Sequence, residues 1–316
     1  MVKVNLFGEN KCANQFLSAG STLNGLNFSI CPYPFPEQNS IFKINYLNSP
    51  GFMESQHNVI EIRDLYKSFW SGSSENEVLK GINLDIKNGN IIGYIGPNGA
   101  GKSTTVKILC GLITDFEGDI RMMGMDLRTD AMEIKKRIGY IPENASLYDS
   151  LTPLEFLSFL GEMRGMEPGK VTDRAMNLLR IFEMEKNANQ RISTFSKGMR
   201  QKVLIISGMI HNPEIIFLDE PLSGLDANSV IMVKEVLTQL ARDGKTIFYS
   251  SHLMDVVEKI SDRIVLIDKG NVIADGTFNE LKAQANDESL EKLFTRLTGS
   301  TGHSDRAEEF IHSVEK

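Results

Sequence analysis

Cysteine is scarce in this sequence. Its 316 residues include only three cysteines, and Cys12, Cys31 and Cys110 lie far apart along the chain. Cysteines at such distances provide neither a disulfide framework nor the ligand spacing of a zinc site. The fold must therefore rest on apolar burial, and 41% hydrophobic with 24% charged residues is typical of globular proteins. The length predicts one large or two ordinary domains, with Cys110 as a plain core residue.

Long apolar runs and an excess of positive charge are also missing. No stretch approaches the roughly 18 apolar residues of a membrane span, and the N-terminus lacks the basic start and apolar core of a signal peptide. The formal net charge of -7 disfavours binding to duplex nucleic acid, which requires a basic surface. The sequence therefore predicts a cytoplasmic protein without a nucleic-acid partner.

One glycine-rich stretch organises the rest of the chain. It reads Gly96-Pro97-Asn98-Gly99-Ala100-Gly101-Lys102-Ser103-Thr104 and fits the phosphate-binding pattern G-x-x-x-x-G-K-[ST]. Residues 91–95 before it are apolar and predict a buried strand, and residues 102–112 after it predict a helix. Strand, glycine-rich turn and helix are the context that this motif requires. That context disfavours the alternative of a turn that binds nothing.

The residue types of this stretch suit a polyphosphate. Glycines let the backbone turn tightly and present its N–H groups, and the helix N-terminus adds unpaired donors and the positive end of its dipole. Lys102 supplies a positive charge for the β- and γ-phosphates, and Ser103 supplies a hydroxyl for Mg2+. The stretch therefore predicts a site for a nucleoside triphosphate with Mg2+.

Two adjacent acids, Asp219 and Glu220, follow four apolar residues at 215–218. The apolar run predicts a buried strand, and open α/β sheets bind ligands at the carboxyl ends of their strands. A carboxylate there can hold Mg2+, and a second one can accept a proton from an attacking water. Residues 245–252 predict another strand, whose last residue, His252, falls at the same edge and can touch a phosphate. With the phosphate loop upstream, the acids indicate an ATPase.

Between these motifs the pattern becomes helical. Thr152, Pro153 and Glu155 have the spacing of a capping box with a first-turn proline, which predicts the start of a helix. We expect a mostly helical insert at about residues 143–200. A further helix is predicted near Ser196, with this serine as its N-cap. Such a capped helix end can receive an anion, although many helices simply start with serine.

The two ends of the chain differ in composition from the rest. Residues 1–57 are rich in Asn, Ser and Gly, and the prolines at 31–36 block regular structure. Two interpretations stay open for this part: a flexible extension, or a misassigned start with translation beginning at Met53. Residues 300–316 are charged and short of apolar residues, which predicts a solvated tail. The predicted functional domain is therefore 58–299.

In their order along the chain, the motifs resemble those of an ATP-binding cassette (ABC) ATPase, the motor subunit of an ABC transporter. The resemblance covers residues 59–299. The matching segments are 96–103 for the Walker A loop, 195–199 for the signature motif, 218–221 for Walker B, 223–226 for the D-loop and His252 for the switch histidine. The resemblance implies an α/β fold with a P-loop NTPase-type core sheet, an antiparallel β subdomain and an inserted α-helical subdomain.

The resemblance also implies which residues form the site. The implied nucleotide-binding residues are Phe69, Gly96, Pro97, Asn98, Gly99, Ala100, Gly101, Lys102, Ser103, Thr104, Glu143, Ser196, Gly198 and Asp226. The implied Mg2+ ligands are Ser103, Asp219 and Glu143. The implied catalytic residues are Glu220 as general base, His252 to position the γ-phosphate and the water, and Lys102. Phe69 falls where the family stacks an aromatic ring on adenine, whereas its spacing alone favours a half-buried strand residue.

Two motifs depart from the family pattern. The signature usually reads L-S-G-G-Q, and Phe195, Lys197 and Met199 replace three of its positions. This variant resembles the branch whose cassettes serve separate export-type permeases. Glu143 stands where the family has the Q-loop glutamine. A carboxylate can still serve Mg2+ at that place, but it repels an unshielded γ-phosphate.

The mechanism implied by the resemblance is a sandwich of two cassettes, made with a second copy or with a related chain. One chain supplies its Walker A and Walker B residues, and the other supplies Ser196 and Gly198 to the same γ-phosphate. ATP then closes the dimer, and hydrolysis reopens it. The helical insert carries the contact to an integral membrane permease. The implied protein is peripheral on the cytoplasmic face of the cell membrane, with ATP and Mg2+ as cofactors and an unidentified export substrate.

Two other functions compete with transport. ABC-type factors that act on ribosomes or DNA are mechanical or regulatory ATPases. The ribosome factors, however, carry two cassettes in one chain, and the DNA-maintenance proteins contain a long coiled coil that this sequence lacks. A nucleotide-binding module without turnover is disfavoured by Glu220 and His252. Co-purification with a membrane protein of several spans would separate transport from the rest.

Overall fold

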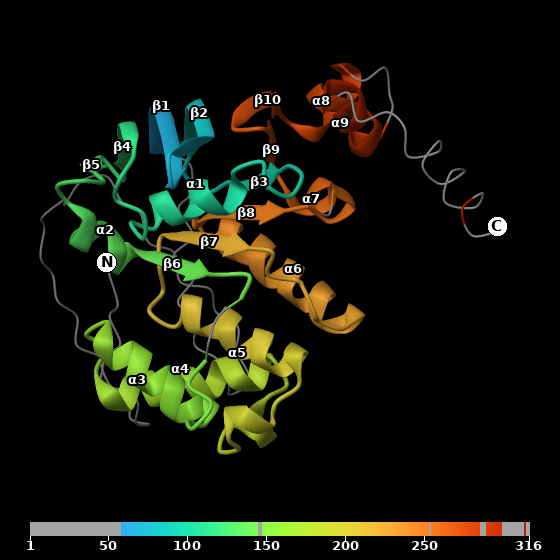
Figure 1. Cartoon of the computed structure of the whole chain (residues 1–316). Coiled ribbons are helices and arrows are strands. Elements are labelled where there is room, and N and C mark those ends of the chain that lie inside the picture. Colours follow the sequence, from blue (N-terminus) through green and yellow to red (C-terminus); the bar gives the residue numbers. More distant parts are fainter. Residues whose placement is uncertain (1–57, 145–146, 253, 285–288, 299–312, 314–316) are drawn as a thin grey trace, which may run out of the picture. The chain divides into compact units, whose positions relative to one another are not determined.

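A computed structural model describes residues 58–144, 147–252, 254–284, 289–298 and 313 of the chain (Figure 1). The predicted extension at 1–57 lies outside the described residues, and so does the tail at 300–316 apart from residue 313. In the part of the chain that the structure describes, no helix has both the length and the apolar character that crossing a membrane requires.

Two sheets and a set of helices make up the described domain. The strands are β1 (Asn58–Ser71), β2 (Ser74–Lys87), β3 (Ile91–Ile95), β4 (Glu117–Met122), β5 (Met125–Asp126), β6 (Ile138–Ile141), β7 (Ile215–Asp219), β8 (Thr246–Ser251), β9 (Arg263–Asp268) and β10 (Asn271–Gly276). The α-helices are α1 (Lys102–Leu109), α2 (Ala131–Arg137), α3 (Pro153–Met163), α4 (Pro168–Ile181), α5 (Lys197–Met209), α6 (Ala227–Arg242), α7 (Met254–Ile260), α8 (Phe278–Gln284) and α9 (Leu290–Thr298). Two short 3-10 helices, η1 (Glu185–Asn187) and η2 (Ile192–Thr194), precede α5.

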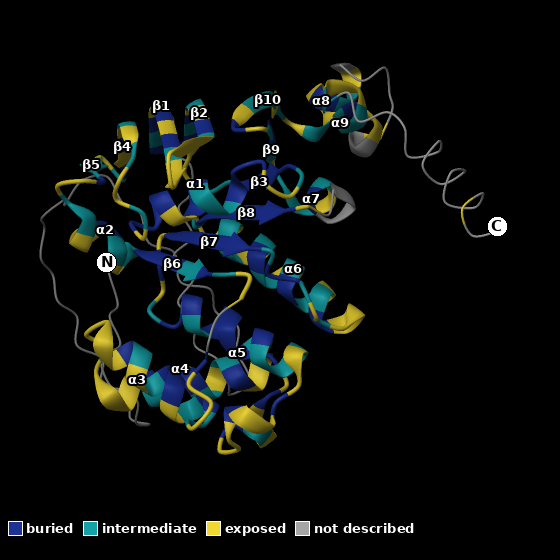
Figure 2. Ribbon diagram, viewed as in Figure 1, coloured by how far each residue is buried: buried dark blue, intermediate teal, exposed yellow. Residues whose placement is uncertain are grey.

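The larger sheet has six strands in the order β10-β9-β3-β8-β7-β6. All neighbouring strands are parallel except β10, which pairs antiparallel with β9 at one edge. Strands β3, β7 and β8 are buried along their whole length (Figure 2), as expected for parallel strands that are covered on both faces. Their carboxyl ends meet at one edge of the sheet, and that edge is where the motifs converge.

Each face of this sheet has its own hydrophobic core. Side chains alternate along a strand, so Ile92 and Tyr94 of β3 pack with helix α1 and the smaller sheet. Ile91 and Ile95 of the same strand pack on the other side with side chains of α5, α6 and the helical segment that follows β6. The smaller sheet is antiparallel, in the order β2-β1-β4-β5. The six-stranded sheet therefore has the antiparallel sheet and α1 on one face, and α5, α6 and the helical segment after β6 on the other.

The segment between β6 and β7 is helical, as predicted. Helix α3 begins with the expected capping box, in which the Thr152 hydroxyl accepts from the N–H of Glu155 and the Glu155 carboxylate accepts from the N–H of Thr152. Phe156 of α3 and Leu179 of α4 are buried in the same core as the sheet residues Ile216 and Leu218. The helical insert and the sheet are therefore continuous through one apolar cluster.

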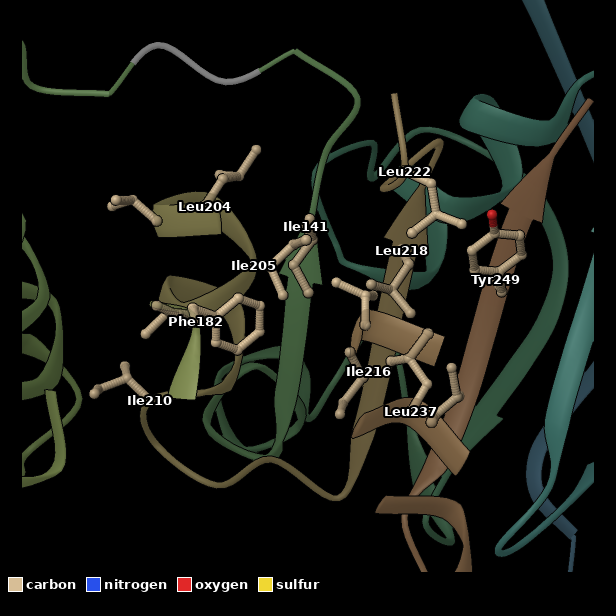
Figure 3. Close-up of a cluster of buried hydrophobic side chains, with 14 of the residues drawn as sticks. Ile141, Phe182, Leu204, Ile205, Ile210, Ile216, Leu218, Leu222, Leu237 and Tyr249 are labelled. Atoms are coloured by element: carbon tan, nitrogen blue, oxygen red, sulfur yellow. The ribbon is translucent and has the colours of Figure 1, made fainter. Parts of the chain in front are cut away.

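Helix α5 lies directly against β6 at the border between insert and sheet. A Cβ at Gly139 of β6 would lie 2.1 Å from the carbonyl oxygen of Gly208 in α5, so the two backbones touch because neither residue has a side chain. Figure 3 shows Ile205 of the same helix beside Ile141 of β6. This contact fixes the second half of α5 to the sheet.

Candidate active site

The phosphate loop joins β3 to α1 and has the conformation that its glycines predict. Gly99 has a φ of 82° and Gly101 a φ of 109°, a region that favours glycine. Gly96 is needed for a different reason, because a Cβ there would lie 2.2 Å from the carbonyl oxygen of Ile267. Helix α1 starts at Lys102 with Gly101 as its N-cap, and no side chain caps this end. The loop and the helix start thus present bare backbone to a ligand.

Lys102 points back over the phosphate loop. Its side chain is only 7% exposed, and its Nζ donates to the carbonyl oxygens of Gly96 at 2.7 Å and Pro97 at 3.1 Å. Burial lowers the pKa of Lys102, while the charges of Glu220, Asp219 and Glu143 act to raise it. The structure therefore places these three predicted acids close enough to Lys102 for their charges to affect its pKa.

Asp219 ends β7 and is held by the neighbouring strand. Its side chain is 3% exposed, and the Ser250 hydroxyl on β8 donates a short hydrogen bond to its Oδ1. The two residues are direct partners in the parallel pairing of β7 and β8. The carboxylate is therefore fixed in orientation at the sheet edge, with its charge near Lys102.

Glu220 follows with a left-handed backbone, at a φ of 48°. This turn carries its carboxylate to the end of β8, where Oε1 accepts from the backbone N–H of His252 at 2.8 Å and lies 2.7 Å from the imidazole Nδ1. The Ser251 hydroxyl donates to Oε2 at 3.2 Å. The structure thus joins Glu220 and His252, which the sequence places 32 residues apart, in a single hydrogen-bonded pair.

Three of the remaining predicted site residues lie at the starts of α5 and α6. Ser196 caps α5, accepting from the N–H of Met199 at 3.3 Å, and Asp226 caps α6, accepting from the N–H of Ser229 at 3.0 Å. Gly198 stands beside the D-loop, because a Cβ there would lie 3.0 Å from the carbonyl oxygen of Gly224. These three residues thus belong to a cluster formed by the starts of two helices.

Phe69 is on β1, with a ring that is 41% exposed and lies under the Nζ of Lys67 at 4.8 Å from the ring centroid. The Lys67 ammonium is also paired with Asp115 at 2.9 Å. The half-exposed strand position agrees with what its spacing indicates. A role in stacking on adenine stays a prediction.

Glu143 faces a hollow of about 220 Å³ between the loop after β6 and the first turns of α5. Its lining residues are Glu143, Asn144, Leu147, Lys197, Arg200, Gln201 and Leu204. Glu143 and Lys197, one departing residue from each of the two motifs, therefore line the same hollow. Both side chains are exposed.

Replacing Glu143 with glutamine should have a mild effect. The substitution restores the residue that the resemblance leads one to expect, and it removes only an exposed charge, so ATP turnover should change by less than about threefold. Steady-state ATPase assays check this, with Glu162→Gln on the exposed face of α3 as the matched control. Loss of most of the activity at position 143 alone would show that the carboxylate has a role of its own.

The oxygen donors of the site fit a magnesium–triphosphate complex. Ser103, in the first turn of α1, offers a hydroxyl, and Asp219 offers a carboxylate, which are the hard ligands that Mg2+ takes in one or two copies together with phosphate oxygens. Among the described residues no group of three or more His, Cys, Asp or Glu side chains could hold a metal ion by itself. The donors thus suit an ion that arrives with the nucleotide.

Several contacts of the site were not predicted from the sequence. Ser250 and Ser251 orient the two acids, yet their only signal is a polar end to an apolar strand. The Gln201 side chain in α5 donates to the carbonyl oxygen of Pro221 at 2.9 Å and is 6% exposed. Lys197 donates to the Ser223 hydroxyl at 3.2 Å. Each of these pairs joins segments whose proximity depends on the fold.

Comparison with known proteins identifies the family. The ABC transporter family profile matches residues 79–223. The linearmycin resistance ATP-binding protein LnrL of Bacillus subtilis is 37% identical over 68% of this chain and 70% of its own length. The ABC transporter ATP-binding protein NatA of the same organism is 35% identical over 75% of this chain and 96% of its own length. This chain belongs to the family of ABC transporter ATP-binding proteins.

Solved structures agree with this assignment. An ATP-binding subunit of an ABC transporter has a TM-score of 0.69 and 31% identity, covering 76% of this chain and 99% of that one. A dimeric ATP-binding cassette in a post-hydrolysis state, bound to ADP and Pi, has a TM-score of 0.66 and 27% identity, covering 69% of this chain and 98% of that one. The predicted family, α/β fold and ABC-type ATPase class are thereby confirmed.

Proposed function

We propose that this chain is the motor subunit of an exporter, which hydrolyses ATP in a dimer of cassettes and drives a separate membrane permease. The observation that carries the proposal is the group formed by buried Lys102, by Asp219 and by the Glu220–His252 pair at the carboxyl edge of the parallel sheet. A phosphate held by the loop meets a cation on one side and a positioned carboxylate on the other. That arrangement suits hydrolysis of the terminal phosphate.

In the proposed reaction, the loop N–H groups and Lys102 bind the β- and γ-phosphates. The Glu220 carboxylate accepts a proton from the attacking water, whose oxygen bonds to the γ-phosphorus as the bond to the bridging oxygen of ADP breaks. The Nδ1 contact of His252 holds that carboxylate in place. Ser103 and Asp219 would hold Mg2+, which neutralises charge on the phosphate oxygens.

The partner cassette is proposed to complete the site. Ser196 and Gly198 stand at the start of α5, where a capped helix N-terminus favours an anion, and they are proposed to bind the γ-phosphate held by the other chain. Asp226 is proposed to act at the same interface, and Phe69 to stack on the adenine of its own chain. The similar cassette that was solved as a dimer bound to ADP and Pi supports the pairing of two chains.

Ser196→Ala tests the two-chain site. ATP turnover should fall by about 10²-fold, the loss expected when one phosphate donor is removed, while Ser193→Ala nearby should leave it unchanged. Mixing Ser196→Ala with Glu220→Gln should restore activity, because a mixed dimer contains one site with an intact serine and an intact glutamate. Steady-state assays of each variant and of the mixture measure this. Full activity of Ser196→Ala as a monomer would refute the two-chain site.

Export through a permease rests on the signature variant and on relatives such as LnrL, which is named for resistance to linearmycin. The site of action is proposed to be the cytoplasmic face of the cell membrane, with the helical insert in contact with the permease. A tagged chain purified from detergent-solubilised membranes should retain a protein of several spans and show faster ATP turnover with it. Retention of ribosomal or DNA-bound proteins in its place would favour a mechanical ATPase outside transport.

A further inference from the structure

The start of α5 is tied to the segment that follows β7 in the same chain. Gln201 is buried and donates to the carbonyl oxygen of Pro221 at 2.9 Å. One turn earlier, Lys197 donates to the Ser223 hydroxyl at 3.2 Å. Residues four apart lie on the same face of a helix, so the two side chains reach two neighbouring points of one segment.

The backbones of the two segments also meet. Gly224 has a φ of 79°, and a Cβ there would lie 2.8 Å from Cδ of Lys197, so the lysine stem crosses the glycine. A Cβ at Gly198 would lie 3.0 Å from the carbonyl oxygen of Gly224. The stem of this exposed lysine thus passes over Gly224, and its Nζ ends in the hydrogen bond to Ser223.

The tied segment continues to the acid proposed as general base. The N–H of Ser223 donates to the carbonyl oxygen of Glu220 at 3.3 Å, closing the turn between them. At its far end α5 is fixed to the sheet by the contact between Gly139 and Gly208. Because the second half of α5 is fixed, movement of the whole helix cannot absorb a displacement of its first turn. Such a displacement therefore moves Ser223, and through the turn it moves Glu220.

We propose that Lys197 is a positioning residue, which ties the signature turn to the D-loop so that engagement of Ser196 by the partner's nucleotide sets the position of Glu220 in its own chain. The inference rests on the proposed function, because Ser196 must act on a second nucleotide. The glycine usual at this signature position could not form the tie. The tie links the two ATP sites of the dimer, which should then hydrolyse ATP cooperatively.

Lys197→Met tests the tie with the full-length chain. Methionine keeps an apolar stem over Gly224 but loses the donor, so the Hill coefficient for ATP should fall from above one toward one and kcat by about fivefold, the low end of coupling between sites. ATP affinity measured without turnover and the melting temperature should not change. Lys197→Arg, which keeps the donor, should behave like the wild type. An unchanged Hill coefficient in Lys197→Met would overturn the proposal.

Ser223→Ala provides a second, independent arm. Ser223→Ala should also lower the Hill coefficient. The double variant should have the same Hill coefficient and kcat as either single variant, because both substitutions remove the same hydrogen bond. Losses that multiply in the double variant would show separate roles and contradict the tie. Ser196→Ala separates the two proposals. If Ser196→Ala loses turnover but Lys197→Met keeps its Hill coefficient, only the tie is rejected. If Ser196→Ala keeps full activity, the two-chain site is rejected.

Discussion

Glu220→Gln should lower ATP turnover by about 10²- to 10⁴-fold, the contribution of a positioned general base. The amide has the size of the carboxylate, and its oxygen can still accept from the N–H of His252. The amide cannot accept a proton from water at neutral pH. ATP binding should persist, because the phosphate loop is unchanged, and the variant should accumulate as an ATP-bound dimer. Steady-state hydrolysis, nucleotide affinity and gel filtration with ATP measure these three effects.

The matched control for this variant is Glu183→Gln. Glu183 is a second glutamate with a left-handed backbone, at a φ of 58°, and it lies exposed after α4. Its substitution tests the same chemical change in the same backbone conformation at a place without phosphate contacts, and turnover should be unaffected. Normal hydrolysis by Glu220→Gln would mean that another group accepts the proton and that the Glu220–His252 pair is structural.

Lys102→Ala should lower ATP turnover by about 10³-fold and weaken ATP binding as well. The substitution removes the buried cation of the phosphate loop and with it the positive charge that interacts with Glu220, Asp219 and Glu143. The γ-phosphate then meets a negative environment both in the ground state and in the transition state, so kcat and affinity should fall together. Hydrolysis assays and equilibrium binding of ATP measure the two losses.

Lys107→Ala is the control for this change, because Lys107 lies on the exposed side of the same helix. It should retain turnover and affinity. Comparable losses in both variants would trace the effect to helix α1 and not to the lysine. Wild-type turnover in Lys102→Ala would refute the assignment of the phosphate loop.

Features that depend on neighbouring residues in the sequence were largely predictable. The phosphate loop, the apolar strands β3, β7 and β8 and the capping box at Thr152 each follow from residue types within about ten positions. Their physical causes act over the same range: glycine freedom, β-branched burial and a side chain that accepts from a nearby N–H. Helix α2 was not predicted, because Ile134 is its one buried residue and gives no amphipathic period.

Contacts between distant segments were not predictable in the same way. That Ser250 orients Asp219 depends on β7 and β8 being neighbours in register, and no local pattern encodes this pairing. The same holds for Gln201 with Pro221 and for Lys197 with Ser223. The resemblance supplied the roles of the site residues, whereas the side chains that hold them in place became visible only in the folded chain.

The left-handed backbone at Glu220 has a consequence for how such a motor can change over time. A residue other than glycine in that conformation carries a backbone strain of about 1 kcal/mol or more. A glycine would relieve this strain but would remove the carboxylate. Glycine at position 220 would therefore relieve the backbone strain and remove the proposed general base in a single substitution.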